Sequence, residues 1–229
     1  MEMNDAQVLE ALLKSHATIQ TNPSRSQLIR SVIDQKEAFV TASGALATWN
    51  PPTATGRSPK DTYIVRRPES EATVDWTSAN NNAMTPELFD GLYADALSAL
   101  EESPSLYQID RVVGAQTSYA VPVQVVTNRA ITALFADTMF RPVPGDLQKS
   151  IFSDKPFTIV VAPTTAVDSQ KYTGKLREVN GKTSPIAIAM DLDRRICVVL
   201  GTLYCGTVKK MMFTVMNYLL PAKGILPLH

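Results

Sequence analysis

Apolar residues recur at helical spacing in several segments of the chain, and each segment predicts a helix. The predicted helices cover residues 5–15, 24–36, 85–101 and the second half of 121–140. Two of them have clear start signals. Ser24 is a good capping residue, and Thr85 caps a helix whose first position is taken by Pro86. These signals indicate helices that pack one face against a core.

Short β-rich or apolar runs, bounded by turn residues, alternate with these helices. They predict strands at residues 62–65, 106–113, 157–161, 186–190 and 196–200, and a hairpin from residues 38–41 and 45–49. Residues 69–83 are polar and are interpreted as an irregular segment on the surface of the protein. Strands interleaved with helices favour an α/β fold, and the expected hairpins make the sheet mixed. We therefore expect a single α/β domain over residues 1–229, with a mixed β-sheet flanked by helices.

The last 30 residues contain the most informative helix. It is predicted from Val208 to Leu220, because a proline and a glycine follow it, and nearly all its faces are apolar, as in a buried helix. Lys209 and Lys210 nevertheless lie in its first turn, where the helix dipole disfavours cations. Free N–H groups at a helix start attract anions, so two lysines there predict a phosphate or carboxylate site. Lysines that simply reach solvent from the end of a core helix explain the pattern equally well.

A second candidate is the loop TGRSPKD at residues 55–61. Its glycine lets the backbone turn and approach a ligand, and its proline stiffens the turn. The guanidinium of Arg57 has a planar fork that matches a carboxylate or a phosphate. By itself, however, such a loop is more often an ordinary polar surface turn.

Composition excludes several classes of partner. Lys and Arg number 22 and Asp and Glu also number 22, so the zero net charge creates no global field for nucleic acid or an anionic membrane. No stretch reaches the ~18 uninterrupted apolar residues of a membrane span, and the N-terminus has no basic region followed by an apolar run. We therefore expect a cytoplasmic protein without membrane or nucleic-acid partners.

Cysteine and histidine usage restricts the chemistry further. Cys197 and Cys205 lack the spacing of a zinc site or a disulfide framework, so reduced and packed thiols are expected. His16 and His229 are the two histidines of the sequence, which excludes most histidine-based mechanisms. Any anion site must therefore be local and built mainly from lysine and arginine.

Three segments together resemble the ATP-dependent phosphoenolpyruvate carboxykinase family. TGRSPKDTYIVR at residues 55–66 is similar to the family's TGRSPKDKYIVR, and VVTNRAITALFADTMF at residues 125–140 is similar to its long central helix. The segment 201–229, GTLYCGTVKKMMFTVMNYLLPAKGILPLH, is close to the family's GTxYxGExKKxxFxxxNYLLPxxGxxxMH. The order of these motifs, together with a weaker match at residues 22–24, extends the resemblance over nearly the whole chain.

The resemblance covers only the N-terminal domain of such enzymes, which binds the organic acid. The family's C-terminal domain, which carries the nucleotide machinery, would be the partner, and no GxxxxGK[ST] phosphate loop occurs in this sequence. The complete enzyme would be a carboxy-lyase of gluconeogenesis that converts oxaloacetate and ATP to phosphoenolpyruvate, ADP and CO2, using Mn2+ or Mg2+. We expect this chain alone to bind no cofactor and to be inactive.

The resemblance also implies roles for individual residues. Arg57 and Tyr204 would bind oxaloacetate or phosphoenolpyruvate, and Lys209 would stabilise the phosphoryl group in transit. Lys210, as a neutral amine, and His229 would be metal ligands. Lys209 and Lys210 are thus the expected catalytic residues.

The sequence departs from the family's pattern at positions close to these motifs. Thr207 stands where the family motif has glutamate, while Ala120 and Gln124 replace arginines and Asn128 replaces a glutamate. These changes motivate an alternative: a stand-alone, non-catalytic module of the same fold that binds a dicarboxylate or a partner protein. A domain without any ligand, whose lysines are merely solvated, is the third possibility.

Overall fold

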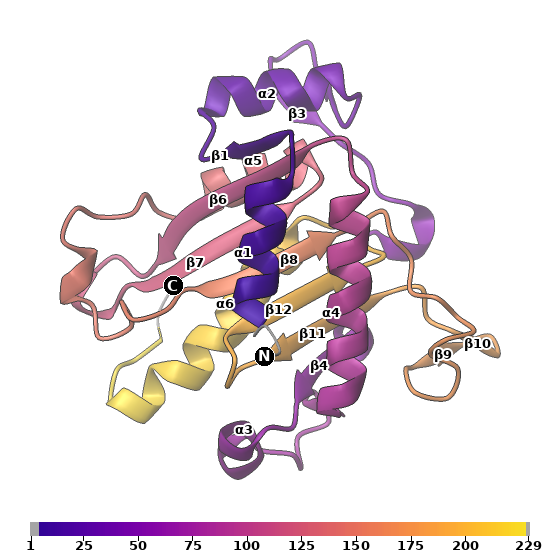
Figure 1. Ribbon diagram of the computed structural model, residues 1–229, viewed down its shortest axis with the longest axis vertical. Helices are drawn as coiled ribbons and strands as arrows, with labels where there is room; N and C mark the ends of the chain where they lie inside the picture. The colour runs from indigo at the N-terminus through magenta and orange to yellow at the C-terminus, as the bar shows by residue number, and fades with distance from the viewer. Residues whose placement is uncertain (1–4, 228–229) are drawn as a thin grey trace.

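A mixed eight-stranded β-sheet forms the centre of the computed structural model, which describes residues 5–227 (Figure 1). Its strands are β1 (Ile19–Thr21), β4 (Thr62–Val65), β5 (Asn82–Met84), β6 (Leu106–Val113), β7 (Val121–Thr127), β8 (Phe157–Ala162), β11 (Ala187–Asp191) and β12 (Ile196–Leu200). The strand order is β1-β6-β7-β8-β12-β11-β4-β5. Neighbours run parallel except in the pairs β6–β7 and β11–β12. The predicted α/β class with a mixed sheet is confirmed.

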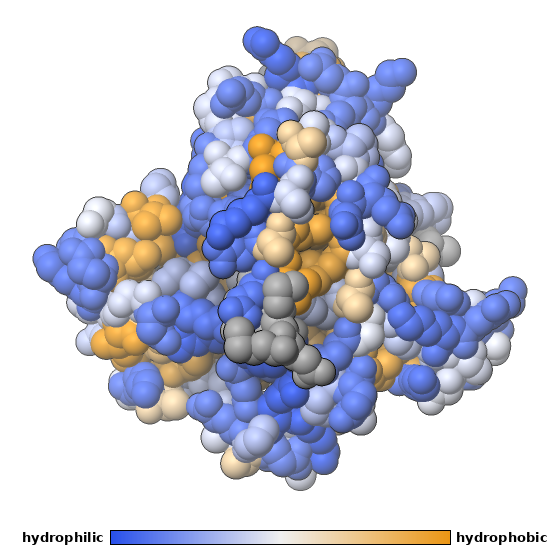
Figure 2. Space-filling view, in the orientation of Figure 1, coloured by the Kyte–Doolittle hydropathy of each residue, from blue (hydrophilic) through white to orange (hydrophobic). Residues whose placement is uncertain are grey.

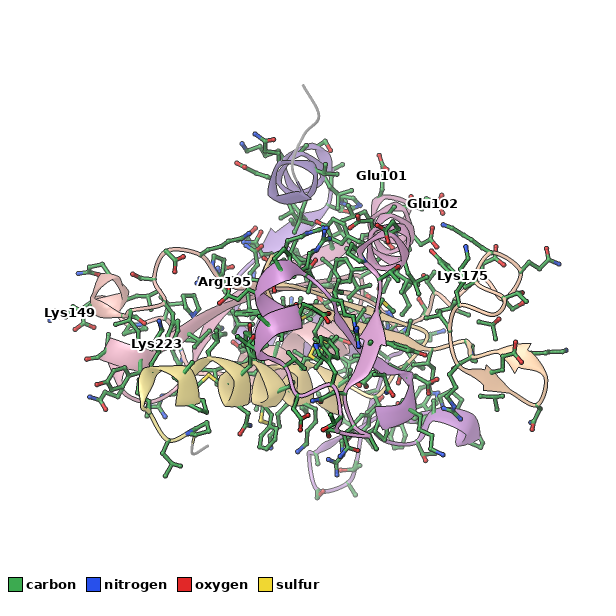
Figure 3. The ribbon with its side chains drawn as sticks, turned by 90° about the horizontal axis from the view of Figure 1, so that it is seen from below. Glu101, Glu102, Lys149, Lys175, Arg195 and Lys223 are labelled. Carbon is green, nitrogen blue, oxygen red and sulfur yellow. The ribbon has the colours of Figure 1, made fainter. Side chains whose placement is uncertain are left out.

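Helices cover both faces of this sheet. They are α1 (Asp5–Ser15), α2 (Arg25–Asp34), α3 (Pro68–Thr73), α4 (Pro86–Glu101), α5 (Ala130–Met139) and α6 (Gly206–Leu219). Buried side chains of α2, α5 and α6 join one hydrophobic core, and those of α1 and α4 join another. Figure 3 shows α6 on one side of the sheet and α1 and α4 on the other. None of the helices within residues 5–227 is long and apolar enough to cross a membrane.

The strands supply these two cores by alternation. Along β12, Cys197 and Val199 belong to the core under α6, whereas Val198 and Leu200 belong to the core under α4, because successive side chains of a strand point to opposite faces. Both faces of the central strands are covered, so every residue of β8, β11 and β12 is buried. Figure 2 shows the α1 and α4 face, which is mostly hydrophilic, with apolar side chains visible between the two helices.

Short elements complete the fold. Two small antiparallel ribbons pair β2 (Phe39–Val40) with β3 (Leu46–Ala47) and β9 (Glu178–Val179) with β10 (Lys182–Thr183). The 3-10 helices are η1 (Pro52–Ala54), η2 (Pro59–Asp61), η3 (Thr117–Tyr119), η4 (Leu147–Lys149) and η5 (Pro221–Lys223). The hairpin expected near residues 38–49 is therefore present, as the ribbon β2–β3.

The start signals read from the sequence are confirmed, and one interpretation is wrong. Ser24 and Thr85 cap α2 and α4 through their side chains. Residues 69–83, expected to be irregular, include most of α3 and the start of β5, which pairs in parallel with β4 at the sheet edge. The strand is only three residues long, Asn82-Ala83-Met84, as edge strands often are, so it is too short for a hydrophobic period that a sequence pattern could reveal.

The topology brings two distant loops to one end of the sheet. β12 runs antiparallel to β11, and β11 runs parallel to β4. The C-terminal end of β12 therefore lies at the same end of the sheet as the N-terminal end of β4. Residues 55–61, which lead into β4, and residues 201–205, which lead from β12 into α6, consequently meet there.

A buried carboxylate joins three elements on the α5 side of the sheet. Asp137 of α5 is 7% exposed and accepts hydrogen bonds from Arg25, at 2.8 Å from Nε, and from Arg111 of β6. Burial alone would raise the pKa of Asp137, but hydrogen bonds and positive charge from the two arginines outweigh it and hold the pKa below its ordinary value. The carboxylate therefore stabilises the fold in its ionised form.

We predict that Asp137→Asn lowers the free energy of unfolding by about 1–3 kcal/mol at pH 7, because it leaves buried donors with a weaker acceptor. A carboxyl whose folded-state pKa is lowered stabilises fully above its unfolded pKa of about 4 and loses this contribution as the pH falls through its folded-state pKa. The difference from the unmodified chain should therefore shrink in urea denaturation below about pH 4. Asp34→Asn, at the exposed end of α2, is the control, and a difference that does not change with pH would contradict the assignment.

Candidate anion-binding site

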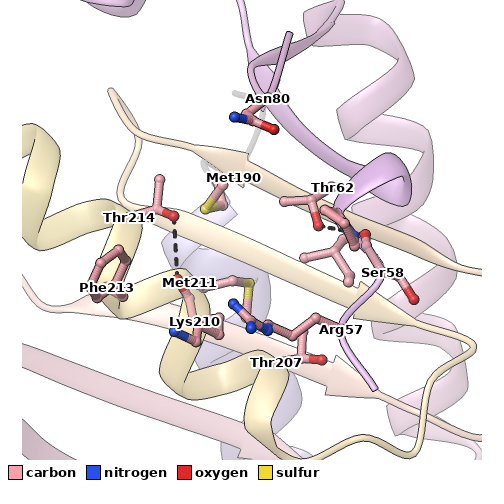
Figure 4. A pocket seen from close by; sticks show the side chains of 12 residues that line it. Arg57, Ser58, Thr62, Asn80, Met190, Thr207, Lys210, Met211, Phe213 and Thr214 are labelled. Atoms are coloured by element: carbon pink, nitrogen blue, oxygen red, sulfur yellow. Dashed lines mark hydrogen bonds between the residues drawn. The ribbon is translucent and has the colours of Figure 1, made fainter. Parts of the chain in front are cut away.

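A cavity of about 390 Å³ opens between the loop before β4 and helix α6 (Figure 4). It is lined by Arg57, Ser58, Pro59, Thr62, Asn80, Ile188, Met190, Thr207, Lys210, Met211, Phe213 and Thr214. The side chains that α6 contributes include Thr207, Lys210, Met211 and Thr214, which are spaced three or four residues apart and so share one face of the helix. Arg57 reaches over this face from the opposite loop (Figure 4).

The charge of the cavity is uniformly positive. Arg57 and Lys210 line it, and no aspartate or glutamate occurs among the described residues that do so. The Lys210 ammonium lies 4.7 Å from the centroid of the Phe213 ring, a cation–π contact that also orients the lysine. Within residues 5–227, Arg57 and Lys210 form no ion pair with a carboxylate. Two uncompensated cations facing one cavity favour an anionic ligand.

Contacts from distant segments hold the loop that carries Arg57. Asp61, buried at the end of the loop, accepts a hydrogen bond from Arg177 Nη1 at 2.7 Å. Asn82 of β5 donates to the Pro59 and Thr62 carbonyl oxygens at 3.2 and 2.8 Å. The sequence analysis missed Arg177 and Asn82, because each is at least 20 residues from its partner and neither belongs to a motif. With the loop fixed, Arg57 is one of the exposed side chains that it presents, and it lines the cavity.

The two remaining described site residues lie outside the cavity lining. Lys209 is exposed in the first turn of α6, and Tyr204 is half-buried in the loop before it. Neither lines the cavity that contains Arg57 and Lys210. The structure thus brings two of the predicted residues into one cavity and leaves two out of its lining, while His229 lies outside the described residues.

The start of α6 differs from the expected free helix terminus. The Thr207 and Val208 N–H groups donate to the Tyr204 and Cys205 carbonyl oxygens at 3.0 and 3.2 Å. These amides are therefore satisfied within the turn and are less available to an anion than the sequence suggested. The positive character of this terminus comes mainly from the side chains of Lys209 and Lys210.

Two glycines shape the loop between β12 and α6. Gly201 has a φ of +73°, and a Cβ there would lie 1.9 Å from the Pro185 carbonyl oxygen, so no other residue fits. A Cβ on Gly206 would lie 2.7 Å from the Tyr204 ring. The ring of Tyr204 therefore rests directly against the glycine at the first position of α6.

A buried glutamate contacts the start of α5. Glu37 is 2% exposed, accepts a hydrogen bond from the Ile131 N–H at 2.6 Å and lies 3.1 Å from Arg129 Nε. Burial raises the pKa of Glu37, against the opposing effects of these two partners. The sequence analysis missed it, because a single glutamate between two apolar segments carries no signal of burial.

The two cysteines are free and act as packing groups, as expected. Burial raises the pKa of the Cys197 thiol and also that of the Cys205 thiol. A raised pKa keeps both thiols protonated near neutral pH and thus weakly nucleophilic.

The departures from the family pattern fall into two places. Thr207 lines the cavity, where its side chain adds no charge. Ala120, Gln124 and Asn128 lie next to or on β7, in the other half of the sheet. There Gln124 donates to Asp110, and Asn128 donates to the Ser103 hydroxyl. One of the four changes therefore alters the cavity.

The described residues do not fit a divalent metal ion by themselves. Residues 5–227 contain no group of three His, Cys, Asp or Glu side chains placed to hold one. The cavity offers the Lys210 amine beside the cationic Arg57, and no carboxylate. Lys210 and His229 thus stay predicted ligands.

Comparison with known proteins gives one consistent result. The family model of phosphoenolpyruvate carboxykinase, ATP-dependent type, matches residues 17–229. The chain is 38% identical over 207 residues to a phosphoenolpyruvate carboxykinase (ATP) of Geobacillus kaustophilus, with 90% of this chain and 37% of that protein covered. It is also 36% identical to the enzyme of Azorhizobium caulinodans, with 99% of this chain and 40% of that protein covered. The identity to the enzyme of Thermus thermophilus is likewise 36%, with 88% of this chain and 36% of that protein covered. The chain therefore spans well under half the length of these relatives.

We predict that Gly206→Ala displaces the Tyr204 ring, because the new methyl group and the ring cannot both stay in place. The ring is a half-buried side chain that can rotate, so the free energy of unfolding should change by less than about 1 kcal/mol. Ring NMR signals of Tyr204, assigned through Tyr204→Phe, measure the displacement. Gly145→Ala is the matched control, since a Cβ there meets nothing within 4 Å. Unchanged Tyr204 signals in Gly206→Ala would refute the contact.

Proposed function

The chain belongs to the ATP-dependent phosphoenolpyruvate carboxykinase family, and we propose that it is the part of such an enzyme that binds the organic acid. The observation that carries this proposal is a cavity that both Arg57 and Lys210 line. No acidic residue occurs among its described lining residues. A dicarboxylate such as oxaloacetate has the complementary charge. The acid would enter from the loop side and place one carboxylate on the fork of Arg57.

The neighbouring residues would then act on the same ligand. Tyr204, next to the cavity, would contact the acid with its hydroxyl group. Loss of CO2 from oxaloacetate leaves an enolate, whose negative charge Arg57 and the two lysines would stabilise. Lys209, exposed on the first turn of α6, would stabilise the phosphoryl group as it passes to the enolate oxygen. These roles are those that the resemblance to the family implies, and they need no proton transfer by histidine.

The complete reaction would require a nucleotide-binding C-terminal domain. In the full enzyme, ATP and Mn2+ or Mg2+ would act together with this chain in gluconeogenesis. Exposed apolar side chains on the ribbon β2–β3 and the segment after it support a contact with such a domain: Phe39 is 58% exposed and Trp49 57%. The cytoplasmic location stays a prediction from the N-terminal sequence.

Calorimetric titration with oxalate, oxaloacetate and phosphoenolpyruvate tests the proposed site. We expect Arg57→Ala to weaken binding of each acid about tenfold or more, because it removes charge-assisted hydrogen bonds. Lys60→Ala removes an exposed cation of the same loop that does not line the cavity, and it should leave binding nearly unchanged. Equal effects of both variants would mean that binding is merely electrostatic. Absence of binding to the unmodified chain would favour the alternative, a non-catalytic module that binds a partner protein.

We also predict that the purified 229-residue chain shows no ATP-dependent conversion of oxaloacetate to phosphoenolpyruvate. The physical reason is that its sequence contains no phosphate-binding GxxxxGK[ST] loop to position ATP. A coupled assay that follows phosphoenolpyruvate formation measures this, with a full-length family enzyme as the positive control. Turnover that depends on both ATP and oxaloacetate would overturn the prediction.

A further inference from the structure

A second hollow lies on the other side of the loop that carries Arg57. This groove has a volume of about 860 Å³ and is lined mainly by residues from 51–61 and 167–186. Arg57, Ser58 and Pro59 line both the groove and the cavity at α6, so the loop forms a wall between the two. The groove therefore adjoins the proposed acid site, but most of its lining comes from other residues.

Positive charge predominates in the groove. Four cationic side chains line it: Arg57, Lys60, Arg177 and Lys182. Asp61 is the single carboxylate among the described lining residues, and its Oδ2 accepts a hydrogen bond from Arg177 Nη1 at 2.7 Å. Arg57, Lys60 and Lys182 are exposed, and within residues 5–227 they form no ion pair. Cations that converge without a counter-charge repel one another, and an anion in the groove removes this cost.

The walls of the groove are held in place by contacts that do not involve its exposed cations. The Arg177 N–H donates to the Tyr63 hydroxyl at 3.0 Å, and the Arg177 side chain pairs with Asp61. These bonds tie the segment that leads into the ribbon β9–β10 to β4 and to the loop before it. The Thr183 hydroxyl, 7% exposed, donates to the Ser169 carbonyl oxygen at 3.1 Å and fixes the other side of the ribbon. The groove is therefore preformed, which lowers the entropic cost of ordering it around a ligand.

The lining restricts the kind of anion that fits. No aromatic side chain occurs among the described lining residues, so a nucleobase would find no ring to stack on. Lys60 and Lys182 each offer a compact point charge, which suits the tetrahedral oxygens of phosphate, whereas a planar carboxylate is matched best by an arginine fork. A linear chain of phosphate groups carries charge along its length. Such a chain can therefore meet cations from both segments at once.

We propose that this groove binds a chain of linked phosphate groups, such as pyrophosphate or tripolyphosphate. Lys60 and Lys182 hold the chain from the two segments, and Arg57 contributes from the wall that the groove shares with the cavity at α6. The bound chain connects the loop before β4 to the ribbon β9–β10 and so stabilises the loop that presents Arg57. The inference is independent of the proposed function, because Lys60 and Lys182 do not line the cavity at α6.

Calorimetric titration of the 229-residue chain with tripolyphosphate, in magnesium-free buffer, tests this site. Lys60→Ala and Lys182→Ala should each raise the Kd about twofold to fivefold, as loss of one exposed ion pair does, and the double variant should raise it about tenfold. The control is the double variant Lys175→Ala/Lys223→Ala, which removes two exposed cations outside the groove (Figure 3) and should change the Kd less than twofold. Absence of tripolyphosphate binding, or equal effects of the two double variants, overturns the inference.

Further titrations separate the groove from the cavity at α6 and from nucleotide recognition. Lys210→Ala alters the cavity alone and should leave the Kd for tripolyphosphate within about twofold, while Lys60→Ala/Lys182→Ala should leave the Kd for oxalate within about twofold. Loss of tripolyphosphate binding in Lys210→Ala but not in the groove variant overturns the inference. A Kd for ATP at least tenfold below that for tripolyphosphate overturns recognition of the phosphate chain alone. Loss of oxalate binding alone counts against the proposed function and leaves this inference standing.

Discussion

The antiparallel pairing of β11 with β12 is the constraint on which the site depends. Because β11 also pairs in parallel with β4, the C-terminal end of β12 and the N-terminal end of β4 meet at one end of the sheet. Arg57, which precedes β4, and Lys210, which follows β12, are separated by more than 150 residues in sequence yet line one cavity. A parallel arrangement of β11 and β12 would place the two loops at opposite ends of the sheet.

Helix α6 contributes both to the hydrophobic core and to the cationic surface at the cavity. One side carries Met212, Val215 and Met216, which are almost completely buried in the core. The other side and the first turn present the lysines and Phe213. Because burial of the apolar side fixes the helix, the lysines are held in place although the dipole at that terminus disfavours them. The cationic surface is thus supported by packing elsewhere on the helix.

The absence of carboxylates from the described cavity lining separates this site from an ordinary surface ion-pair network. Elsewhere in residues 5–227, most arginines are paired with acids, as Arg67 is with Asp191 and Arg177 is with Asp61. Those pairs join segments of the fold. Where the cations of a cavity have no acidic partner, an anionic ligand can supply the complementary charge, and this supports a binding role for the cavity.

The sequence by itself determined the types of most elements, though not α3 and β5, as well as the caps at Ser24 and Thr85, the α/β class and the motifs that carry Arg57, Tyr204, Lys209 and Lys210. These are set by local spacing and by short-range hydrogen bonds, which a sequence displays directly. The tertiary structure alone decided that Arg57 and Lys210 share a cavity, that Asn82 and Arg177 hold the loop, that Glu37 is buried and that the Thr207 and Val208 N–H groups of α6 are satisfied. Each of these depends on strand order and on contacts between distant segments, which no local pattern records.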